Sequence, residues 1–242
     1  MDLPIGERTL VVGVVNATDD SFSGDGLGDD VGAIRALGER MLTDGADLID
    51  VGAASSRPGQ TKVPLELELR RATAAVEALR DLGVPLAIDS TRDKVVEACL
   101  RAGARIVNDV SGLSDVRLAE LAARHDGWIV LMHSARRPGR RAERDDDPGT
   151  IVEAVVAGLR DARERAVRAG VSPGRIVVDP GLGFDKTAAE SFALLCHLPR
   201  VREVAPVLVG PSRKGHLGVA TGRGVRERVV ATVAAVACAV MN

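Results

Sequence analysis

Short apolar runs alternate with longer amphipathic segments along the chain, and this alternation limits the folds that the sequence can adopt. Each run is rich in β-branched residues, as expected for a strand that is buried on both faces. The runs are Thr9–Val15, Asp47–Gly52, Pro85–Asp89, Arg105–Asp109, Trp128–His133, Arg175–Asp179 and Ala205–Gly210. The segments with apolar residues at helical spacing are Asp30–Asp44, Glu66–Leu82, Arg92–Ala102, Asp115–Arg124, Thr150–Ala169, Ala188–His197 and Val225–Val240. Strict alternation of this kind predicts a parallel sheet.

Two parallel-sheet architectures compete, an open doubly wound sheet and a (β/α)8 TIM-type barrel. Polar or turn-forming residues close the first six runs, and Ser212, Arg213 and Lys214 follow the seventh. A barrel gathers all strand ends at one face, whereas an open sheet uses mainly those beside its switch point. We therefore predict an α/β fold of the (β/α)8 TIM-type barrel class, as a single domain over residues 1–242. Seven βα units are visible, and we expect the eighth to be missing.

Composition excludes several classes of function. Because 32 basic residues face 34 acidic ones, no basic surplus is left to neutralise nucleic-acid phosphates. The chain has 2% aromatic residues, which disfavours a platform that stacks bases. Three widely spaced cysteines and the lack of a signal peptide indicate a reduced, cytoplasmic protein. The longest apolar stretch, from Val229, is too short to span a bilayer. We expect small-molecule substrates, with neither nucleic acid nor membrane as a partner.

Carboxylate and carboxamide side chains stand at the ends of three apolar runs. Asp89, Asn108 and Asp179 occupy these positions. A buried carboxylate is costly unless it is bound or hydrogen-bonded, so such residues at one mouth suit a flat heterocycle rich in N–H donors. Each of them could alternatively cap a following helix. Their shared placement favours a binding site, and we expect them to converge with Lys214 on one pocket.

Other strand ends offer metal ligands and cations. The polar stretch after Asn16 provides oxygen ligands suited to Mg²⁺, although a plain solvated loop is an equally good interpretation. Arg57, in a turn after the second run, could hold a carboxylate or phosphate, although a solvated surface turn is favoured on this evidence. Lys214 could neutralise substrate charge or donate to a ring carbonyl. Arg136–Asp147 is a charged stretch expected to form a loop.

Seven motifs together resemble dihydropteroate synthases, in particular the actinobacterial form. They are VNATDDSF, DVGAASSRPG, AIDS, VNDVSG, LMH, DPGLGFDKT and GPSRK, and they span about Val11 to Lys214. The resemblance implies a pterin-binding (β/α)8 barrel that joins 6-hydroxymethyl-7,8-dihydropterin pyrophosphate to p-aminobenzoate in folate synthesis, with Mg²⁺ as cofactor. It also implies a target for sulfonamides. The family's eighth strand, with an Arg-x-His anion site, is not found before Asn242.

The resemblance also implies roles for individual residues. The residues that would bind the pterin are Asp89, Asn108, Met132, Asp179 and Lys214. Asp89 and Lys214 would serve catalysis, Asp89 by stabilising a cationic pterin methylene. Asn16 would hold Mg²⁺ and pyrophosphate. The residues that would shape the p-aminobenzoate pocket are Ser56, Arg57, Pro58, Phe184 and Ser212.

The sequence leaves two alternative functions open, and it also predicts an oligomeric state. The chain could be a degenerate paralogue that binds a pterin without condensing it, or a pterin-dependent methyltransferase domain of the corrinoid-linked kind. NATDDSF and SRK argue against the methyltransferase. The final helix is apolar nearly all round and should therefore be covered. In the resembled family the last helices form the dimer interface, so we expect a homodimer.

Overall fold

The computed structural model describes residues 3–18, 27–54, 63–134 and 148–242. By their internal contacts these residues fall into two compact units. The N-terminal unit comprises Met1–Val110, Asp115–Ile129 and Ala166–Arg175, and the C-terminal unit comprises Ser111–Ser114, Val130–Arg165 and Ile176–Asn242. The expectation of a single domain over residues 1–242 stays a prediction.

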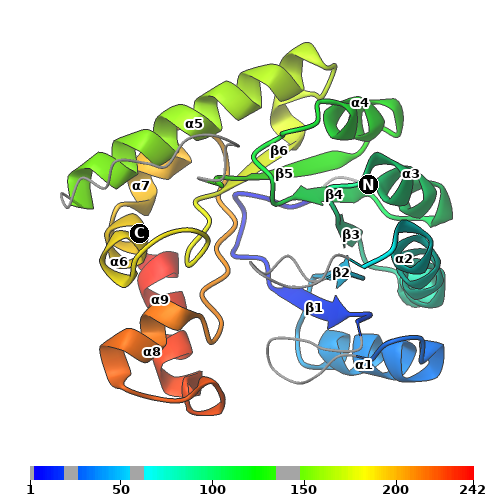
Figure 1. The fold of residues 1–242 in the computed structure, drawn as a ribbon, viewed down its shortest axis with the longest axis horizontal. Helices are drawn as coiled ribbons and strands as arrows, with labels where there is room; N and C mark the ends of the chain where they lie inside the picture. The colour runs from blue at the N-terminus through cyan, green and yellow to red at the C-terminus, as the bar shows by residue number, and fades with distance from the viewer. Residues whose placement is uncertain (1–2, 19–26, 55–62, 135–147) are drawn as a thin grey trace. The chain divides into compact units, whose positions relative to one another are not determined.

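Six parallel strands confirm the first six predicted runs and the α/β fold class. They are β1 (Val12–Asn16), β2 (Leu48–Gly52), β3 (Leu86–Asp89), β4 (Ile106–Asp109), β5 (Trp128–Met132) and β6 (Ile176–Asp179). They follow one another in the sheet in chain order (Figure 1). In the N-terminal unit the register aligns Asn16 with Gly52, Gly52 with Asp89, and Asp89 with Asn108. Four neighbouring strands therefore end in one row.

The predicted seventh strand, Ala205–Gly210, is wrong for the part of the chain that the structure describes. One isolated parallel bridge joins Val207 to Val178. The Val178 N–H donates to Pro206 O at 2.9 Å, and the Leu208 N–H donates to Val178 O, also at 2.9 Å. Pro206 has no N–H to donate at one side of the bridge, and Pro180 after β6 has none at the other, so the ladder cannot extend in either direction.

Helices follow the strands as predicted, with two short additions. The helices are α1 (Val31–Thr43), α2 (Leu65–Leu79), α3 (Asp93–Ala102), α4 (Arg117–Arg124), α5 (Pro148–Arg168), α6 (Ala188–Cys196), α7 (Leu198–Arg202), α8 (Gly215–Thr221) and α9 (Val229–Met241). α7 and α8 were not predicted, because five and seven residues are too few to show a helical period. The Asp30 side chain caps α1 by accepting from the Ala33 N–H at 2.9 Å.

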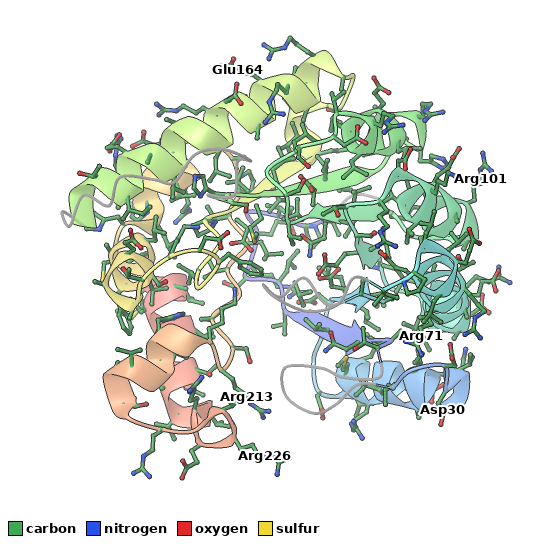
Figure 2. The ribbon with its side chains drawn as sticks, in the orientation of Figure 1. Asp30, Arg71, Arg101, Glu164, Arg213 and Arg226 are labelled. Carbon is green, nitrogen blue, oxygen red and sulfur yellow. The ribbon has the colours of Figure 1, made fainter. Side chains whose placement is uncertain are left out.

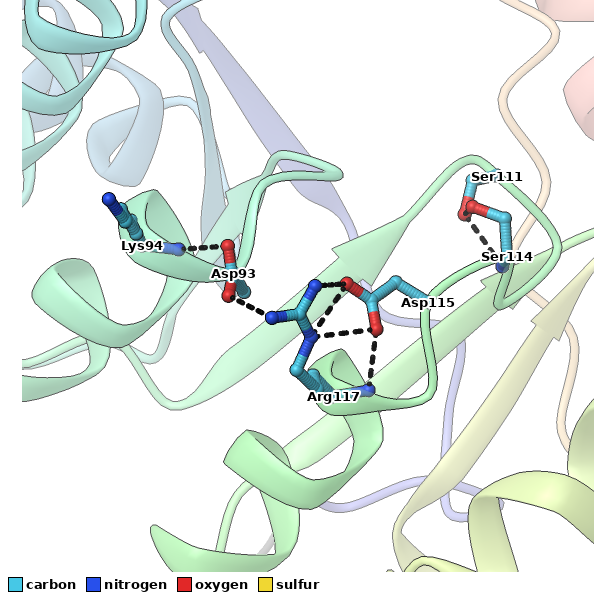
Figure 3. Close-up of polar contacts among 6 residues, drawn as sticks. All are labelled: Asp93, Lys94, Ser111, Ser114, Asp115 and Arg117. Carbon is cyan, nitrogen blue, oxygen red and sulfur yellow. Dashed lines mark hydrogen bonds and ion pairs between the residues drawn. The ribbon is translucent and has the colours of Figure 1, made fainter.

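The N-terminal unit packs α1 to α4 along its strands (Figure 1). Gly38 lets α1 approach α2, since a Cβ there would lie 2.4 Å from Leu79 Cδ2. The Arg71 side chain, labelled on α2 in Figure 2, is 7% exposed and pairs with Asp29 at 3.2 Å. Arg117 at the start of α4 pairs with Asp93 of α3 at 3.1 Å and with Asp115 at 2.9 Å (Figure 3). Helix packing and peripheral ion pairs thus hold the outer layer of this unit.

The C-terminal unit has an aliphatic core of its own. The buried side chains come from the five helices α5 to α9 and from the segments around β6 and after α7. They include Val155, Leu159, Val178, Leu194 and Leu217. α9 buries Ala235, but Val230, Val233 and Met241 are 81%, 63% and 87% exposed. One face of α9 therefore remains uncovered by the described residues.

Candidate functional site

The row of strand ends in the N-terminal unit brings together three predicted site residues. Asn16, Asp89 and Asn108 occupy aligned positions on β1, β3 and β4. Gly52 lies between Asn16 and Asp89. A Cβ on Gly52 would lie 3.9 Å from Asn16 Oδ1 and 4.0 Å from Asp89 Oδ2. Because Gly52 has no side chain, the amide of Asn16 and the carboxylate of Asp89 border the same space.

Asp50 is a fourth polar residue of this group, and sequence reasoning missed it. Its Oδ2 accepts a hydrogen bond from Asn108 Nδ2 at 2.8 Å. This bond orients the Asn108 amide, so that its Oδ1 remains available as an acceptor. Asp50 Oδ1 is buried with no hydrogen-bond partner among the described residues. A buried acceptor of this kind favours a ligand that supplies an N–H.

Burial also changes the acidity of these carboxyl groups. It raises the pKa of Asp50 to about 6, against the opposing effect of the hydrogen bond from Asn108. Burial raises the pKa of Asp89 well above its ordinary value, and the nearby charges of Asp50, Asp109 and Glu68 raise it further. Desolvation and like charge both penalise the ionised forms. A ligand with positive charge or several N–H donors would relieve that penalty.

A side-chain network anchors the end of β3. Ser90 Oγ donates to the buried Glu68 Oε1 at 2.6 Å. Arg92 Nη1 lies 3.0 Å from Glu68 Oε2, as an ion pair without the alignment of a hydrogen bond. Arg92 Nη2 donates to Val63 O at 2.8 Å. Glu68 on α2 therefore fixes the residue that follows Asp89, and through Arg92 it fixes Val63.

The C-terminal unit holds Asp179 at the end of β6. This carboxylate is 8% exposed, and its Oδ1 accepts from the Gly181 N–H at 2.7 Å. Its backbone oxygen accepts from the His133 N–H at 2.8 Å. Burial raises the pKa of Asp179, whereas the positive charge of Lys214, the hydrogen bond from Gly181 and the charge of Lys186 lower it. The carboxylate is therefore held in one orientation beside two cations.

Two lysines hold the loop between β6 and α6. Lys214 Nζ donates to Leu182 O at 2.6 Å and lies 4.4 Å from the centre of the Phe184 ring. Lys186 Nζ donates to the carbonyls of His133, Gly181 and Phe184 at 3.2, 3.1 and 3.2 Å. Burial lowers the pKa of Lys214, against the attraction of Asp179. The predictions included Lys214 but not Lys186, because contacts with backbone oxygens leave no pattern in the sequence.

Met132, Ser212 and Arg213 complete the C-terminal group. Met132 is buried, and its Cγ would lie 3.3 Å from a Cβ on Gly181. Ser212 is exposed in the turn before α8. Arg213, labelled in Figure 2, has a left-handed φ of 52°, and its N–H donates to Thr232 Oγ1 at 3.0 Å. The backbone of the Ser-Arg-Lys turn is thus fixed beside Lys214.

The predicted residues accordingly fall into two groups. Asn16, Asp89 and Asn108 lie together in the N-terminal unit. Met132, Asp179, Phe184 and Lys214 lie together in the C-terminal unit. Convergence of the two groups on one pocket stays a prediction. Ser56, Arg57, Pro58 and the charged stretch Arg136–Asp147 lie outside the described residues.

His216 is a buried histidine of the C-terminal unit, 3% exposed at the start of α8. Its ring packs edge-on against Phe192 with the centres 5.3 Å apart. Burial lowers the pKa of His216, and the charges of Lys214 and Arg228 lower it further. The neutral imidazole therefore serves as a packing group in this core.

The described residues offer one candidate magnesium ligand and no membrane-spanning helix. Within them, no group of three or more His, Cys, Asp or Glu side chains is arranged to hold a metal ion. Asn16 Oδ1 is an oxygen ligand suited to Mg²⁺, which is commonly bound through one or two protein oxygens together with substrate phosphates. The donor chemistry of Asn16 thus fits an ion that arrives with a phosphorylated substrate. No helix in the described ranges is both long and apolar enough to cross a membrane.

Comparisons with known proteins agree with this site chemistry. Residues 12–242 match a family described as "Pterin binding enzyme". Dihydropteroate synthase from Clostridium beijerinckii is 35% identical over 98% of this chain and 87% of its own length. The Xanthomonas albilineans dihydropteroate synthase with 4-aminobenzoic acid matches with a TM-score of 0.87 and 39% identity, over 97% of this chain and 85% of that one. The Yersinia pestis dihydropteroate synthase with a sulfonamide drug matches with a TM-score of 0.87 and 33% identity, over 100% and 90%. These matches confirm the predicted barrel class.

Proposed function

Because the chain belongs to the dihydropteroate synthase family of pterin-binding enzymes, we propose that it condenses 6-hydroxymethyl-7,8-dihydropterin pyrophosphate with p-aminobenzoate. The products are 7,8-dihydropteroate and pyrophosphate, so the enzyme is a transferase of folate biosynthesis. The observation that carries the proposal is the register of Asn16, Asp89 and Asn108 beside a glycine that leaves their shared space open.

The pterin is recognised through its N–H groups and its ring carbonyl. The Asn108 amide, oriented by Asp50, presents Oδ1 as an acceptor. Asp89 and Asp179 accept from ring N–H donors, and each such bond relieves the cost of the buried carboxylate. Lys214 donates to the ring carbonyl, and Met132 packs against the ring face. These assignments rest on the family and on the chemistry of each side chain.

The reaction is an ionising substitution. The bond between the methylene carbon and the pyrophosphate oxygen breaks, and its electron pair leaves with pyrophosphate. Asp89 stabilises the cationic methylene electrostatically, and the half-buried position of its carboxylate strengthens the effect. The arylamine nitrogen then forms the new C–N bond and loses a proton to water. This route requires no general base from the chain.

The leaving group needs its charge neutralised. Mg²⁺ supplies this neutralisation when it is bound, and Asn16 Oδ1 is the ligand that the described part of the chain offers to it. Phe184 and Ser212, with Ser56, Arg57 and Pro58, shape the p-aminobenzoate pocket in this proposal. A sulfonamide resembles p-aminobenzoate and competes for the same pocket.

We also propose a homodimer in the cytoplasm. Val230, Val233 and Met241 expose an apolar face on α9, which a second copy would cover. The cysteines Cys99, Cys196 and Cys238 are free, as expected in a reducing compartment. Light scattering at micromolar concentration tests the dimer, and a cooperatively melting monomer would contradict it.

A turnover assay tests the function itself. Purified protein is incubated with the pterin pyrophosphate and p-aminobenzoate, with and without Mg²⁺, and dihydropteroate is measured by mass spectrometry. We expect product that depends on Mg²⁺ and is inhibited competitively by a sulfonamide. Pterin binding without condensation, in protein shown by circular dichroism to be folded, would replace the synthase by a pterin-binding paralogue.

A further inference from the structure

Lys186 is a cation of the C-terminal unit whose contacts the proposed chemistry does not use. Its ammonium carries three N–H donors, and three backbone carbonyls accept from it. His133 provides one carbonyl directly after β5, and Gly181 and Phe184 provide the others from the loop after β6. With all three donors committed, Lys186 has none left for a substrate. Any effect on the reaction must pass through the residues that it holds.

The carbonyls that Lys186 joins belong to a crowded turn. Gly181 has a left-handed φ of 70°, and a Cβ there would lie 2.3 Å from His133 O. The Gly181 N–H meanwhile binds Asp179 Oδ1 at 2.7 Å. Backbone dipoles that converge in this way repel one another unless a cation lies among them. Lys186 therefore stabilises the turn that orients Asp179.

The base from which Lys186 extends is rigid. Thr187 is the N-cap of α6, and its side chain accepts from the Glu190 N–H at 3.2 Å in a capping box. Ser191 Oγ donates to Thr187 O at 2.9 Å and accepts from the Gly183 N–H at 3.2 Å. The start of α6 and the loop are thus bonded on both sides of Lys186.

We propose that Lys186 is a positioning residue, which holds Asp179 for the pterin and Phe184 for the arylamine by fixing the carbonyls of Gly181 and Phe184. This proposal rests on the proposed synthase function. It separates the two lysines of the unit. Lys214 donates to one described carbonyl and lies over the Phe184 ring. Lys186 instead donates to three backbone carbonyls, so it acts through the backbone.

A pH dependence follows from the burial of Lys186. Burial lowers its pKa to about 8, and the charges of Asp179 and Asp185 oppose this shift. The charged groups that face it are Asp179, Asp185, Glu190 and Lys214. Above about pH 8 the ammonium loses a proton, and with it one donor and the positive charge. The loop should then loosen, and the KM for p-aminobenzoate should rise.

The experiment compares Lys186→Met and Lys186→Arg with Lys94→Met, which removes an exposed lysine of α3. kcat and both KM values are measured at about pH 7 and about pH 9. For Lys186→Met we expect the KM for p-aminobenzoate to rise about tenfold at the lower pH and to change little with pH. The wild type and Lys94→Met should instead show the rise between the two pH values. Lys186→Arg keeps its charge at the higher pH and should lose the pH effect while retaining a raised KM.

Several outcomes would overturn the proposal. Unchanged KM values in Lys186→Met, or a fall in kcat with both KM values unchanged, would remove the positioning role. If Lys186→Met fails to fold by circular dichroism, Lys186→Arg decides by the same criteria. If the wild type shows no turnover, the synthase function fails separately. The role of Lys186 is then judged by calorimetry with 6-hydroxymethylpterin, for which folded Lys186→Arg should bind about tenfold more weakly and equal affinity would refute the role.

Discussion

The two units position their polar groups by different physical means. In the N-terminal unit, strand register sets Asn16, Asp89 and Asn108 in one row, so the ladder of backbone bonds fixes their spacing. In the C-terminal unit, Phe184 and Lys214 stand on a loop and a turn, and lysine bonds to carbonyls hold the loop. A site built on strands needs little support beyond the sheet, whereas a site built on loops needs dedicated cations.

The electrostatics differ in the same way. Burial raises the pKa of Asp50 and of Asp89, and the charge of Asp50 raises the pKa of Asp89 further. Asp179 is also buried, but the charges of Lys214 and Lys186 offset the rise in its pKa. The N-terminal group is therefore short of positive charge, and the C-terminal group is balanced. Four substitutions test this contrast.

The largest effect is expected for Asp89→Asn. Removing the charge that stabilises a cationic methylene should lower kcat by about 10²–10³-fold, in line with losses at other electrostatic sites. Steady-state kinetics measures the change, with the exposed Asp81→Asn as the matched control. A loss of less than about tenfold would show that Asp89 binds the ring without stabilising the transition state.

Asp179→Ala should abolish most of the pterin affinity. Each ring N–H that loses a charged acceptor costs roughly 1.5–3 kcal/mol, which corresponds to roughly 10–100-fold per bond. Calorimetry with 6-hydroxymethylpterin measures the loss, again beside Asp81→Asn. Undiminished affinity would remove Asp179 from the pterin site and leave its carboxylate as a cap for Gly181.

Asp50→Asn should raise the stability of the protein and lower its affinity for the pterin. The folded protein raises the pKa of Asp50 from 3.8 to about 6, so the native state binds more protons than the unfolded state between these values. Native stability therefore falls as pH rises through this window. The neutral amide should increase the free energy of unfolding near pH 7 by at most about 3 kcal/mol, and the gain should vanish below about pH 4.

Urea unfolding at both pH values measures this gain, and calorimetry measures the accompanying loss of pterin affinity. A variant that is less stable than the wild type near neutral pH would mean that Asp50 is not penalised by its burial.

The smallest effect is expected for Ser90→Ala. The change leaves Glu68 Oε1 buried without its hydroxyl donor, which should cost about 1–2 kcal/mol of stability. Ser114→Ala is the control, because the exposed Ser114 hydroxyl donates to Ser111 Oγ at 2.9 Å. Urea midpoints compare the two, and equal midpoints would show that the anchor at the end of β3 is dispensable for stability.

The sequence predicted the strand-built half better than the loop-built half. Asn16, Asp89 and Asn108 were found because each ends an apolar run. Asp50 was missed because it lies inside such a run, where a polar residue carries no positional signal. Its bond to Asn108 depends on the pairing of separate strands.

The contacts of Lys186 depend on where three carbonyls meet, which only the folded backbone determines. The predicted seventh strand is an error of the opposite kind, a predicted element that the described residues do not form. Its apolar pattern favoured a strand, although Pro206 at the second position disfavours one. Local pattern predicted the elements, and tertiary pairing decided how their ends are used.

The glycines of the two groups differ in the substitutions that the fold would tolerate. A methyl group on Gly52 would meet its neighbours at ordinary van der Waals distance, so the fold accepts alanine and only a ligand would reject it. A methyl group on Gly181 would collide with His133 O, so the fold itself rejects any replacement. If selection acted only on the amount of folded protein, residue 52 would be free to change and residue 181 would not. Selection for turnover would constrain both positions. Variation at position 52 without variation at position 181 would therefore indicate that the fold is retained without the ligand.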